Sequence, residues 1–378
     1  MVLQPGGLSM PDPIDARHFP RRVTLASLCA LALLAPTADA AAQAQRVFRD
    51  WLATCDNQRD CRANALDVAA GEPAGHLWFE RSASGPAEAI HLVLPEAQPR
   101  AGDWRLHADA SGLLELTDAQ LDCGEVGESQ PCGALVLDAP AEVEAVLAAL
   151  RRAGALRLTR DGVEVARVSL SGASAALLWV DEQQKRLDTA DAFVRRGDRA
   201  PAPPPAPPRA PQAERNAWRS LSGEAAAAAL AAARAEAGES CAPLPPGFEG
   251  EESAYAHRDG RRMVALTCFV GAYNLGSDWY RSAGEGWAPI GFPFPAGFRD
   301  ADVAPQHLVN AYFDPEPAQL SATNKGRGWG DCGWSARWLW TGAGFDLVEL
   351  RAMPECRGVQ EPHWPALWRA GRADAPLR

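Results

Sequence analysis

The cysteines constrain the fold of this chain more than any other feature of its sequence. Nine occur, and eight of them follow an apolar N-terminal segment. An even number of cysteines in an exported chain indicates disulfide bonds, although spacing alone leaves their connectivity open. Short separations favour bonds between neighbours along the chain, which are Cys55 with Cys61, Cys123 with Cys132, Cys241 with Cys268, and Cys332 with Cys356.

The N-terminal segment predicts export. Arginines at positions 17, 21 and 22 precede the apolar run from Val23 to Ala35, and Ala38-Asp39-Ala40 has the small residues of a cleavage site. This pattern is typical of a bacterial signal peptide, here residues 1–40, with a start at Met1 or Met10. The apolar run is shorter than the roughly 20 residues of a membrane-spanning helix, and none like it follows. We expect a periplasmic or secreted protein without a transmembrane segment in its mature chain.

Charge and motifs argue against several functions. The net charge of −11 repels phosphate backbones, so nucleic acid is not an expected partner. The sequence contains no G-x-S-x-G, P-loop, C-x-x-C or H-E-x-x-H pattern, and its histidines are scattered. We therefore expect no catalytic residue, metal or cofactor, and the sequence leans against an enzyme.

Proline and alanine mark a boundary within the chain. Residues 199–215 include the run APAPPPAPPRAPQAE, which lacks core-forming residues and favours an extended, semi-rigid conformation. This predicts a linker between an N-terminal domain, residues 45–198, and a C-terminal domain, residues 241–378. Residues 216–240 hold an alanine-rich helix that Gly238 can end.

The side-chain pattern predicts an α+β fold with two domains. In the first domain strands lead, a helix begins at Pro140, a hairpin turns at Asp161-Gly162, and a second helix runs from Ala173 through Leu187. The second domain is mainly β and stabilised by disulfide bonds. In its stretch WSARWLWTGAGFDLVELRAM, alternation places Trp334, Trp338 and Trp340 on one face of a strand.

Four segments resemble one bacterial exported family. They are FRDWLATCDNQRDCRA near the start, VSLSGASAALLWVDEQQKR at 168–186, GAYN at 271–274, and GRGWGDCG at 326–333. The family is DUF1176, a domain of unknown function, and the resemblance extends over nearly the whole mature chain. It implies a compartment and an architecture, but it transfers no catalytic residue.

The loop before Cys332 offers the most specific candidate for binding. Lys325 and Arg327 lie among glycines, whose flexible backbone suits a carboxylate or phosphate oxygen, although a solvated hairpin loop is the commoner outcome. Tryptophans at positions 329, 334, 338 and 340 either fill the core or form an aromatic surface that stacks on sugar rings or a peptide. The candidate ligand-binding residues are Lys325, Arg327, Trp329, Trp334, Trp338 and Trp340.

The function that follows is binding to an envelope glycan or another exported protein. One alternative is a cell-envelope hydrolase whose paired carboxylates, Asp331 and Glu355, flank the proposed Cys332 to Cys356 bond, because glycoside hydrolysis uses two carboxyls about 5–10 Å apart. Another is a secreted enzyme inhibitor that presents the loop 324–333. Calcium binding by Asp56 and Asp60 is disfavoured, since the loop lacks the glycine and alternating oxygen ligands of a calcium site.

Overall fold

Alternating apolar and polar residues make this a mostly β protein. The structure is a computed structural model, and it describes residues 44–66, 75–85, 89–122, 132–244, 250–300 and 302–371. Within these residues, strands β1 to β22 far outnumber the α-helices α1 to α3. The expected β-rich character is therefore confirmed, whereas so few helices do not establish the α+β class. The predicted signal peptide, residues 1–40, lies outside the described residues.

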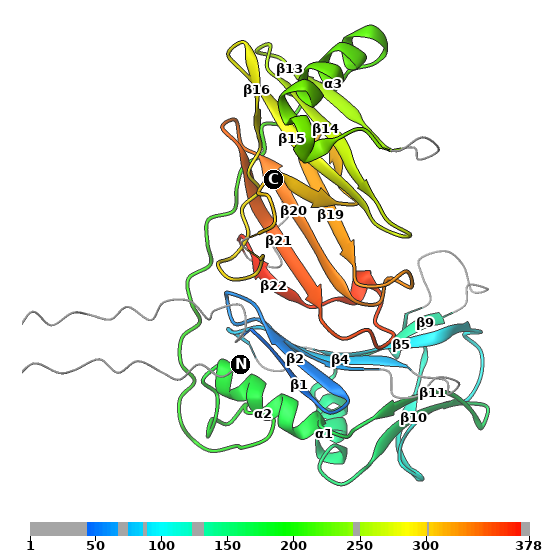
Figure 1. Cartoon of the computed structure of the whole chain (residues 1–378). Helices are drawn as coiled ribbons and strands as arrows, with labels where there is room; N and C mark the ends of the chain where they lie inside the picture. The colour runs from blue at the N-terminus through cyan, green and yellow to red at the C-terminus, as the bar shows by residue number, and fades with distance from the viewer. Residues whose placement is uncertain are drawn as a thin grey trace, which may run out of the picture. The chain divides into compact units, whose positions relative to one another are not determined.

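The first half of the chain forms two antiparallel sheets (Figure 1). One has seven strands in the order β1-β2-β3-β4-β5-β9-β8, and the other has four in the order β11-β10-β6-β7. The strands are β1 (Gln45–Phe48), β2 (Trp51–Cys55), β3 (Cys61–Ala65), β4 (His76–Arg81), β5 (Ala89–Gln98), β6 (Trp104–Ala108), β7 (Ser111–Leu116), β8 (Leu121–Asp122), β9 (Cys132–Leu137), β10 (Ala155–Arg160) and β11 (Val163–Ser169), with a 3-10 turn η1 (Asp118–Gln120).

Two helices cover this part, α1 (Pro140–Ala149) and α2 (Ala173–Gln183). A fully buried ion pair joins α2 to the sheet, with Arg81 Nη2 2.7 Å from Asp181 Oδ1. The backbone N–H groups of Phe193 and Val194 also donate to the Asp181 carboxylate. A buried ion pair offsets its desolvation only when further hydrogen bonds satisfy it, as they do here.

The second half is a sandwich of two antiparallel sheets. One has the strand order β12-β13-β14-β15-β16, with β17 also on β15, and the other has the order β18-β19-β20-β21-β22. The strands are β12 (Trp218–Ser220), β13 (Ser253–His257), β14 (Arg262–Val270), β15 (Leu275–Ala283), β16 (Gly286–Pro289), β17 (His307–Val309), β18 (Tyr312–Asp314), β19 (Gln319–Lys325), β20 (Gly333–Trp340), β21 (Phe345–Met353) and β22 (Ala366–Arg369).

The alanine-rich helix α3 (Gly223–Ala237) packs on the outer face of the β12 to β16 sheet (Figure 1). Its small face fits closely because Ala229 and Ala233 are its buried residues, and they meet Val264 and Leu266 of β14. The helix ends at Gly238, which has a positive φ of 58°. Two short 3-10 turns, η2 (Gly238–Cys241) and η3 (Glu361–His363), complete the elements of this half.

The proline-rich segment lies against the sandwich without regular secondary structure. The Pro208 carbonyl accepts a hydrogen bond from the Gly371 N–H at 2.9 Å, and the Glu214 N–H donates to the Trp340 carbonyl at 2.8 Å. The described residues belong to one compact unit. The boundary at residues 199–215 and the domain ranges on either side of it therefore stay a prediction.

Three disulfide bonds are present among the described residues, Cys55–Cys61, Cys241–Cys268 and Cys332–Cys356. These join the cysteines that short separation favours. Cys132 is also disulfide-bonded, and Cys123 lies outside the described residues. In the part of the chain that the structure describes, no helix has the length and apolar character to cross a membrane.

Candidate functional site

Three exposed aromatic side chains gather on two neighbouring loops of the sandwich. Phe269 and Tyr273 belong to the β14–β15 hairpin, and Trp329 belongs to the β19–β20 connection. Their exposed fractions are 55 %, 42 % and 75 %. We call Phe269, Tyr273 and Trp329 the aromatic loop surface. Trp329 was expected from the sequence, whereas Phe269 and Tyr273 were missed because nothing local distinguishes them from core aromatics.

The segments that carry Tyr273 and Trp329 touch each other. The Tyr273 hydroxyl donates to the Gly326 carbonyl at 3.3 Å. A Cβ atom at Gly328 would lie 3.4 Å from the Tyr273 ring, so this ring packs against the backbone next to Trp329. On the other side, a Cβ at Gly271 would lie 3.1 Å from the Phe269 ring. Tyr273 therefore lies beside the loop of Trp329, and Phe269 lies near the end of the same hairpin as Tyr273.

One amide side chain holds the two loops together. Asn274 donates from Nδ2 to the Lys325 carbonyl at 2.9 Å, and its Oδ1 accepts the Lys325 N–H at 3.2 Å. Asn310 donates from Nδ2 to the same Oδ1 at 2.9 Å, and also to the Thr323 carbonyl. This network joins the GAYN segment to the glycine-rich loop, which lie about fifty residues apart in the sequence.

The glycines around Cys332 are required by close packing. Gly333 has a φ of 134°, and a Cβ there would overlap the Asn324 carbonyl across the strand pair. A Cβ at Gly326 would lie 2.8 Å from the Cys332 sulfur. Glycine at these positions therefore allows the tight bend and the disulfide bond to form, since glycine adopts such a φ readily and has no side chain to clash.

The loop holds one uncommitted cation rather than two. Arg327 donates from both Nε and Nη2 to the Asp331 carboxylate, and the Gly358 N–H donates to Asp331 Oδ2 at 2.8 Å. The hydrogen bonds from Arg327 are the first cause that lowers the pKa of Asp331. Lys325 has no side-chain ion pair with the described residues. Of the two candidate binding residues, Arg327 is therefore paired within the loop, whereas Lys325 is not.

Two of the predicted tryptophans are core residues. Trp334, Trp338 and Trp340 do share one face of β20, but that face points between the sheets. Trp338 and Trp340 are 0 % and 1 % exposed, and Trp334 is half-buried against Phe294. The aromatic surface expected from the sequence therefore excludes Trp338 and Trp340, because alternation fixes a shared face without saying which side is covered.

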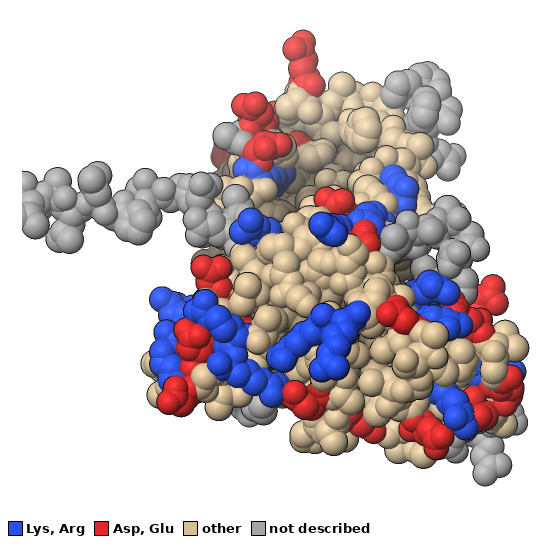
Figure 2. Space-filling model, turned by 90° about the horizontal axis from the view of Figure 1, so that it is seen from below, with Lys and Arg blue, Asp and Glu red and all other residues tan. Residues whose placement is uncertain are grey.

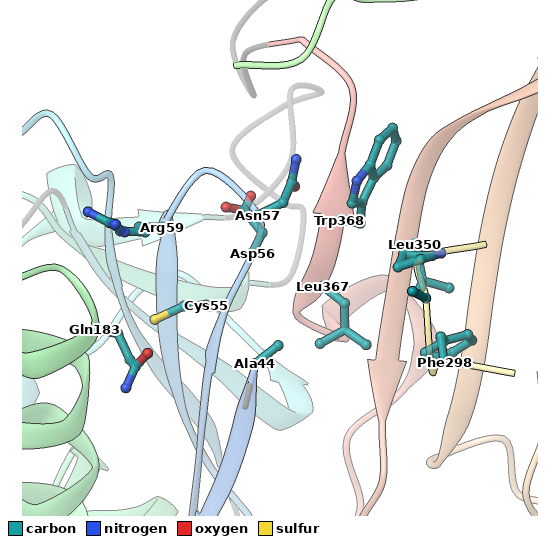
Figure 3. Close-up of a pocket in the computed structure, with 12 residues that line it drawn as sticks. Ala44, Cys55, Asp56, Asn57, Arg59, Gln183, Phe298, Leu350, Leu367 and Trp368 are labelled. Carbon is teal, nitrogen blue, oxygen red and sulfur yellow. The ribbon is translucent and has the colours of Figure 1, made fainter. Parts of the chain in front are cut away.

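A cavity of 310 Å³ lies beside the β2–β3 hairpin (Figure 3). Its polar side includes Asp56, Asn57 and Arg59 from that hairpin, and its apolar side is formed by side chains of the sandwich. The apolar residues that Figure 3 labels on that side are Phe298, Leu350, Leu367 and Trp368.

The carboxyl group of Asp56, which lines this cavity, has a raised pKa. Its Oδ1 accepts the backbone N–H groups of Gln58 and Asp60 at 2.8 and 3.0 Å. Its buried Oδ2 accepts no hydrogen bond from the described residues, and Arg369 Nη1 stands 3.7 Å away. Burial, followed by the nearby charge of Asp60, raises the pKa of Asp56 to about 6. The sequence places Asp56 between Cys55 and Cys61, which are predicted to form a disulfide bond, but no sequence pattern indicates the raised pKa of Asp56.

Histidines that are far apart in the sequence meet around Trp78. The Trp78 ring centroid lies 4.8 Å from that of His91, 5.1 Å from His76 and 5.3 Å from His363. Arg62 covers the same ring at 4.8 Å. Burial is the first cause that lowers the pKa of His76 to about 3. No group of acidic, histidine or cysteine residues that could hold a metal ion occurs among the described residues.

Basic side chains gather on the face shown in Figure 2, interleaved with acidic ones. The segment after α2 contains several arginines. Arg195 pairs with Asp188 at 2.7 Å and Arg196 pairs with Glu144 at 2.6 Å. Much of this positive charge is thus balanced locally, which makes the face a poor candidate for anion binding.

Comparison with known proteins gives a family but no activity. The family described as "Protein of unknown function (DUF1176)" matches residues 45–371. The chain is 32 % identical over 343 residues to "Uncharacterized protein YpfG" of Escherichia coli (strain K12). This match covers 87 % of this chain and 93 % of that protein. No solved structure matches the chain.

Proposed function

Because the chain belongs to the DUF1176 family of proteins of unknown function, its surface must indicate its role, and we propose that it is an exported, non-catalytic binding protein. Its ligand would be a glycan of the bacterial envelope, held by the aromatic loop surface. Disulfide bonds in the described residues and the signal-like N-terminus support export.

The observation that carries this proposal is the exposure of Phe269, Tyr273 and Trp329 on two segments that touch each other. Folding normally removes such rings from water, because each square ångström of buried apolar area contributes roughly 25 cal/mol. A grouped set of exposed apolar side chains therefore marks an interaction surface. Sugar rings have apolar C–H faces that pack on aromatic rings, and their hydroxyls suit the Tyr273 hydroxyl and the Lys325 ammonium at the edge.

The support beneath the rings favours binding. The Asn274 network and the Cys332–Cys356 bond hold both loops before a ligand arrives. A surface ordered in advance loses less conformational entropy on binding, so more of the contact energy remains as affinity.

The proposal is tested by titrating the mature protein with soluble peptidoglycan fragments and other envelope glycans, using calorimetry. Trp329→Ala should weaken binding at least tenfold. Tyr312→Ala is the matched control, since Tyr312 is a 66 % exposed aromatic of β18 outside this surface. If no envelope glycan binds, or if both variants bind like the parent protein, the aromatic loop surface is not a glycan site.

Inhibition of a foreign enzyme is a second candidate, favoured by the exposure of Trp329 on a loop whose end is anchored by the Cys332–Cys356 bond. Such a loop would insert its tryptophan into the cleft of a partner enzyme. A stoichiometric complex with an envelope-degrading hydrolase, abolished by Trp329→Ala, would support this role over glycan binding.

Hydrolysis by paired carboxylates has less support. A general acid needs a raised pKa, yet Arg327 lowers the pKa of Asp331 and engages both of its oxygens. Asp331 is fully buried, so its carboxylate serves the loop rather than a substrate.

A further inference from the structure

We propose a second binding site, a groove around Trp368 that takes a short oligosaccharide bearing carboxylates. The groove consists of two cavities of 310 and 650 Å³ that share Pro295 and Trp368 as walls. We call it the Trp368 groove. Small-ligand sites commonly have volumes of about 300–1,000 Å³, and both cavities fall within that range.

Much of the lining of the groove, which we call its floor, is apolar. Trp368 is half-buried, so part of its indole remains available. Phe298 lines the first cavity and Phe294 the second, and these two rings stack with centroids 5.7 Å apart. Prolines 208, 211, 293 and 295 add further rigid apolar surface. Such a floor fits the apolar faces of successive sugar rings.

The rim supplies hydrogen-bonding groups that the fold leaves unused. Arg59 and Gln183 line the first cavity, and Arg209 and Gln212 line the second. None of these four side chains makes a hydrogen bond or ion pair with another described residue. Two guanidinium groups and two amides are therefore available to carboxylates and hydroxyls.

The uncommitted charge of the groove is positive, although the chain has a net charge of −11. Of the two acidic residues that line it, Asp56 has a cationic partner in Arg369, whose Nη1 lies 3.7 Å from its Oδ2. Asp56 accepts two backbone N–H groups, and Asp346 Oδ2 accepts the Thr341 hydroxyl at 3.0 Å. Arg59 and Arg209, which have no ion pair with a described residue, outnumber Asp346, the one lining carboxylate without a described cationic partner, which favours a ligand with negative groups.

The walls also argue against a peptide that binds as an extra strand. The neighbouring edge of β22 is occupied, because Arg369 N–H donates to Asn57 Oδ1 at 2.8 Å and its carbonyl accepts from Asn57 Nδ2 at 3.1 Å. Elsewhere in the lining, Pro208 and Pro211 have no backbone N–H to donate. Strand addition needs a free ladder of backbone groups, which neither wall offers. A ligand must bind through ring faces and side groups.

The test uses the mature protein and calorimetric titration with a tetramer of galacturonic acid, its methyl ester and a neutral cello-tetraose. The acidic tetramer should bind at least tenfold more tightly than the other two. The double variant Arg59→Gln with Arg209→Gln should remove that preference. Arg152→Gln is the matched control, because this exposed arginine follows α1 and lines neither cavity.

Three outcomes would overturn the proposal. The first is equal binding of the acid and its ester, and the second is undiminished binding by the double variant. The third is tight binding of a hexaglutamate peptide, which would assign the groove to acidic peptides instead. Trp329→Ala separates this site from the aromatic loop surface, because its loss should leave the tetramer affinity unchanged.

Discussion

We expect the partly buried His76 to make stability depend on pH. Its pKa is lowered to about 3, by burial first and then by the charges of His363 and Arg62. Burial also leads the causes that lower the pKa values of His91 and His363. A histidine whose folded pKa lies below its unfolded value, near 6.5, contributes stability above that value and loses it as the pH falls toward the folded pKa.

We therefore expect the free energy of unfolding to decrease between about pH 6.5 and about pH 3. His76→Gln keeps a polar group beside Asn64 but cannot be protonated, so it should lose less stability over this range. Urea unfolding at a series of pH values measures the difference. Parallel profiles of the parent and the variant would show that His76 does not titrate as proposed.

Asp56 provides an internal control of opposite sign. Its pKa is raised to about 6, so its contribution is present below the ordinary value near 3.8 and is lost as the pH rises through 6. Asp56→Asn keeps an acceptor for the Gln58 and Asp60 N–H groups. In this variant stability should rise more steeply with pH between about 4 and 6 than in the parent protein.

At the scale of elements, the disulfide bonds should differ in what they contribute. Cys332–Cys356 closes a loop with a sequence separation of 24, against 6 for Cys55–Cys61. Because a longer loop restricts the unfolded chain more, removing the first bond should cost about 1 kcal/mol more, within a typical range of about 2–4 kcal/mol. Denaturant unfolding of the two paired Cys→Ser variants measures this. Equal losses would point to folded-state strain rather than chain entropy.

Turn and helix signals in the sequence located several elements well. The hairpin at Asp161-Gly162 has both residues at positive φ, the conformation that this pair favours. The helix expected at Pro140 begins there. The helix expected to reach Leu187 ends at Gln183, because Lys185 adopts a left-handed φ of 58° and the Arg186 N–H turns back to the Asp181 carbonyl.

The candidate sites were predicted less completely than the elements. A local pattern identified the loop around Cys332 and the exposed Trp329, since glycines and a cysteine mark a tight bend. It could not identify Tyr273 beside Gly326 or Trp368 beside Asn57, because these contacts depend on strand order across long separations. The scattered histidines illustrate the same point, since strand pairing and η3 bring three of them to Trp78.

Across the whole molecule, one small apolar cluster joins the two halves of the chain. Leu52 and Leu66 of the first half pack with Met353, Val359 and Trp364 of the second, and all five are buried. Hydrogen bonds accompany this cluster, including Gln45 Nε2 to the Ala352 carbonyl at 2.9 Å. The two halves therefore share part of their core.

We expect the described halves to unfold together. Met353→Ala should destabilise the protein by about 2–5 kcal/mol, as is usual when a buried side chain leaves a cavity. Near-UV circular dichroism and hydrogen exchange at residues of both halves should report one transition in the parent and in the variant. Two separate transitions in the parent protein would show that the shared cluster does not couple them.

The hydrogen-bond network of Asn274 leaves the tip of the glycine-rich loop open to substitution. Asn274 forms hydrogen bonds with the backbone of Lys325 at the base of the glycine-rich loop, whereas Trp329 at the tip is exposed. These hydrogen bonds do not involve the side chain of residue 329, so we expect them to persist when that side chain is replaced. We therefore expect that substitutions at position 329 would change the exposed surface of the loop without altering the backbone that supports it.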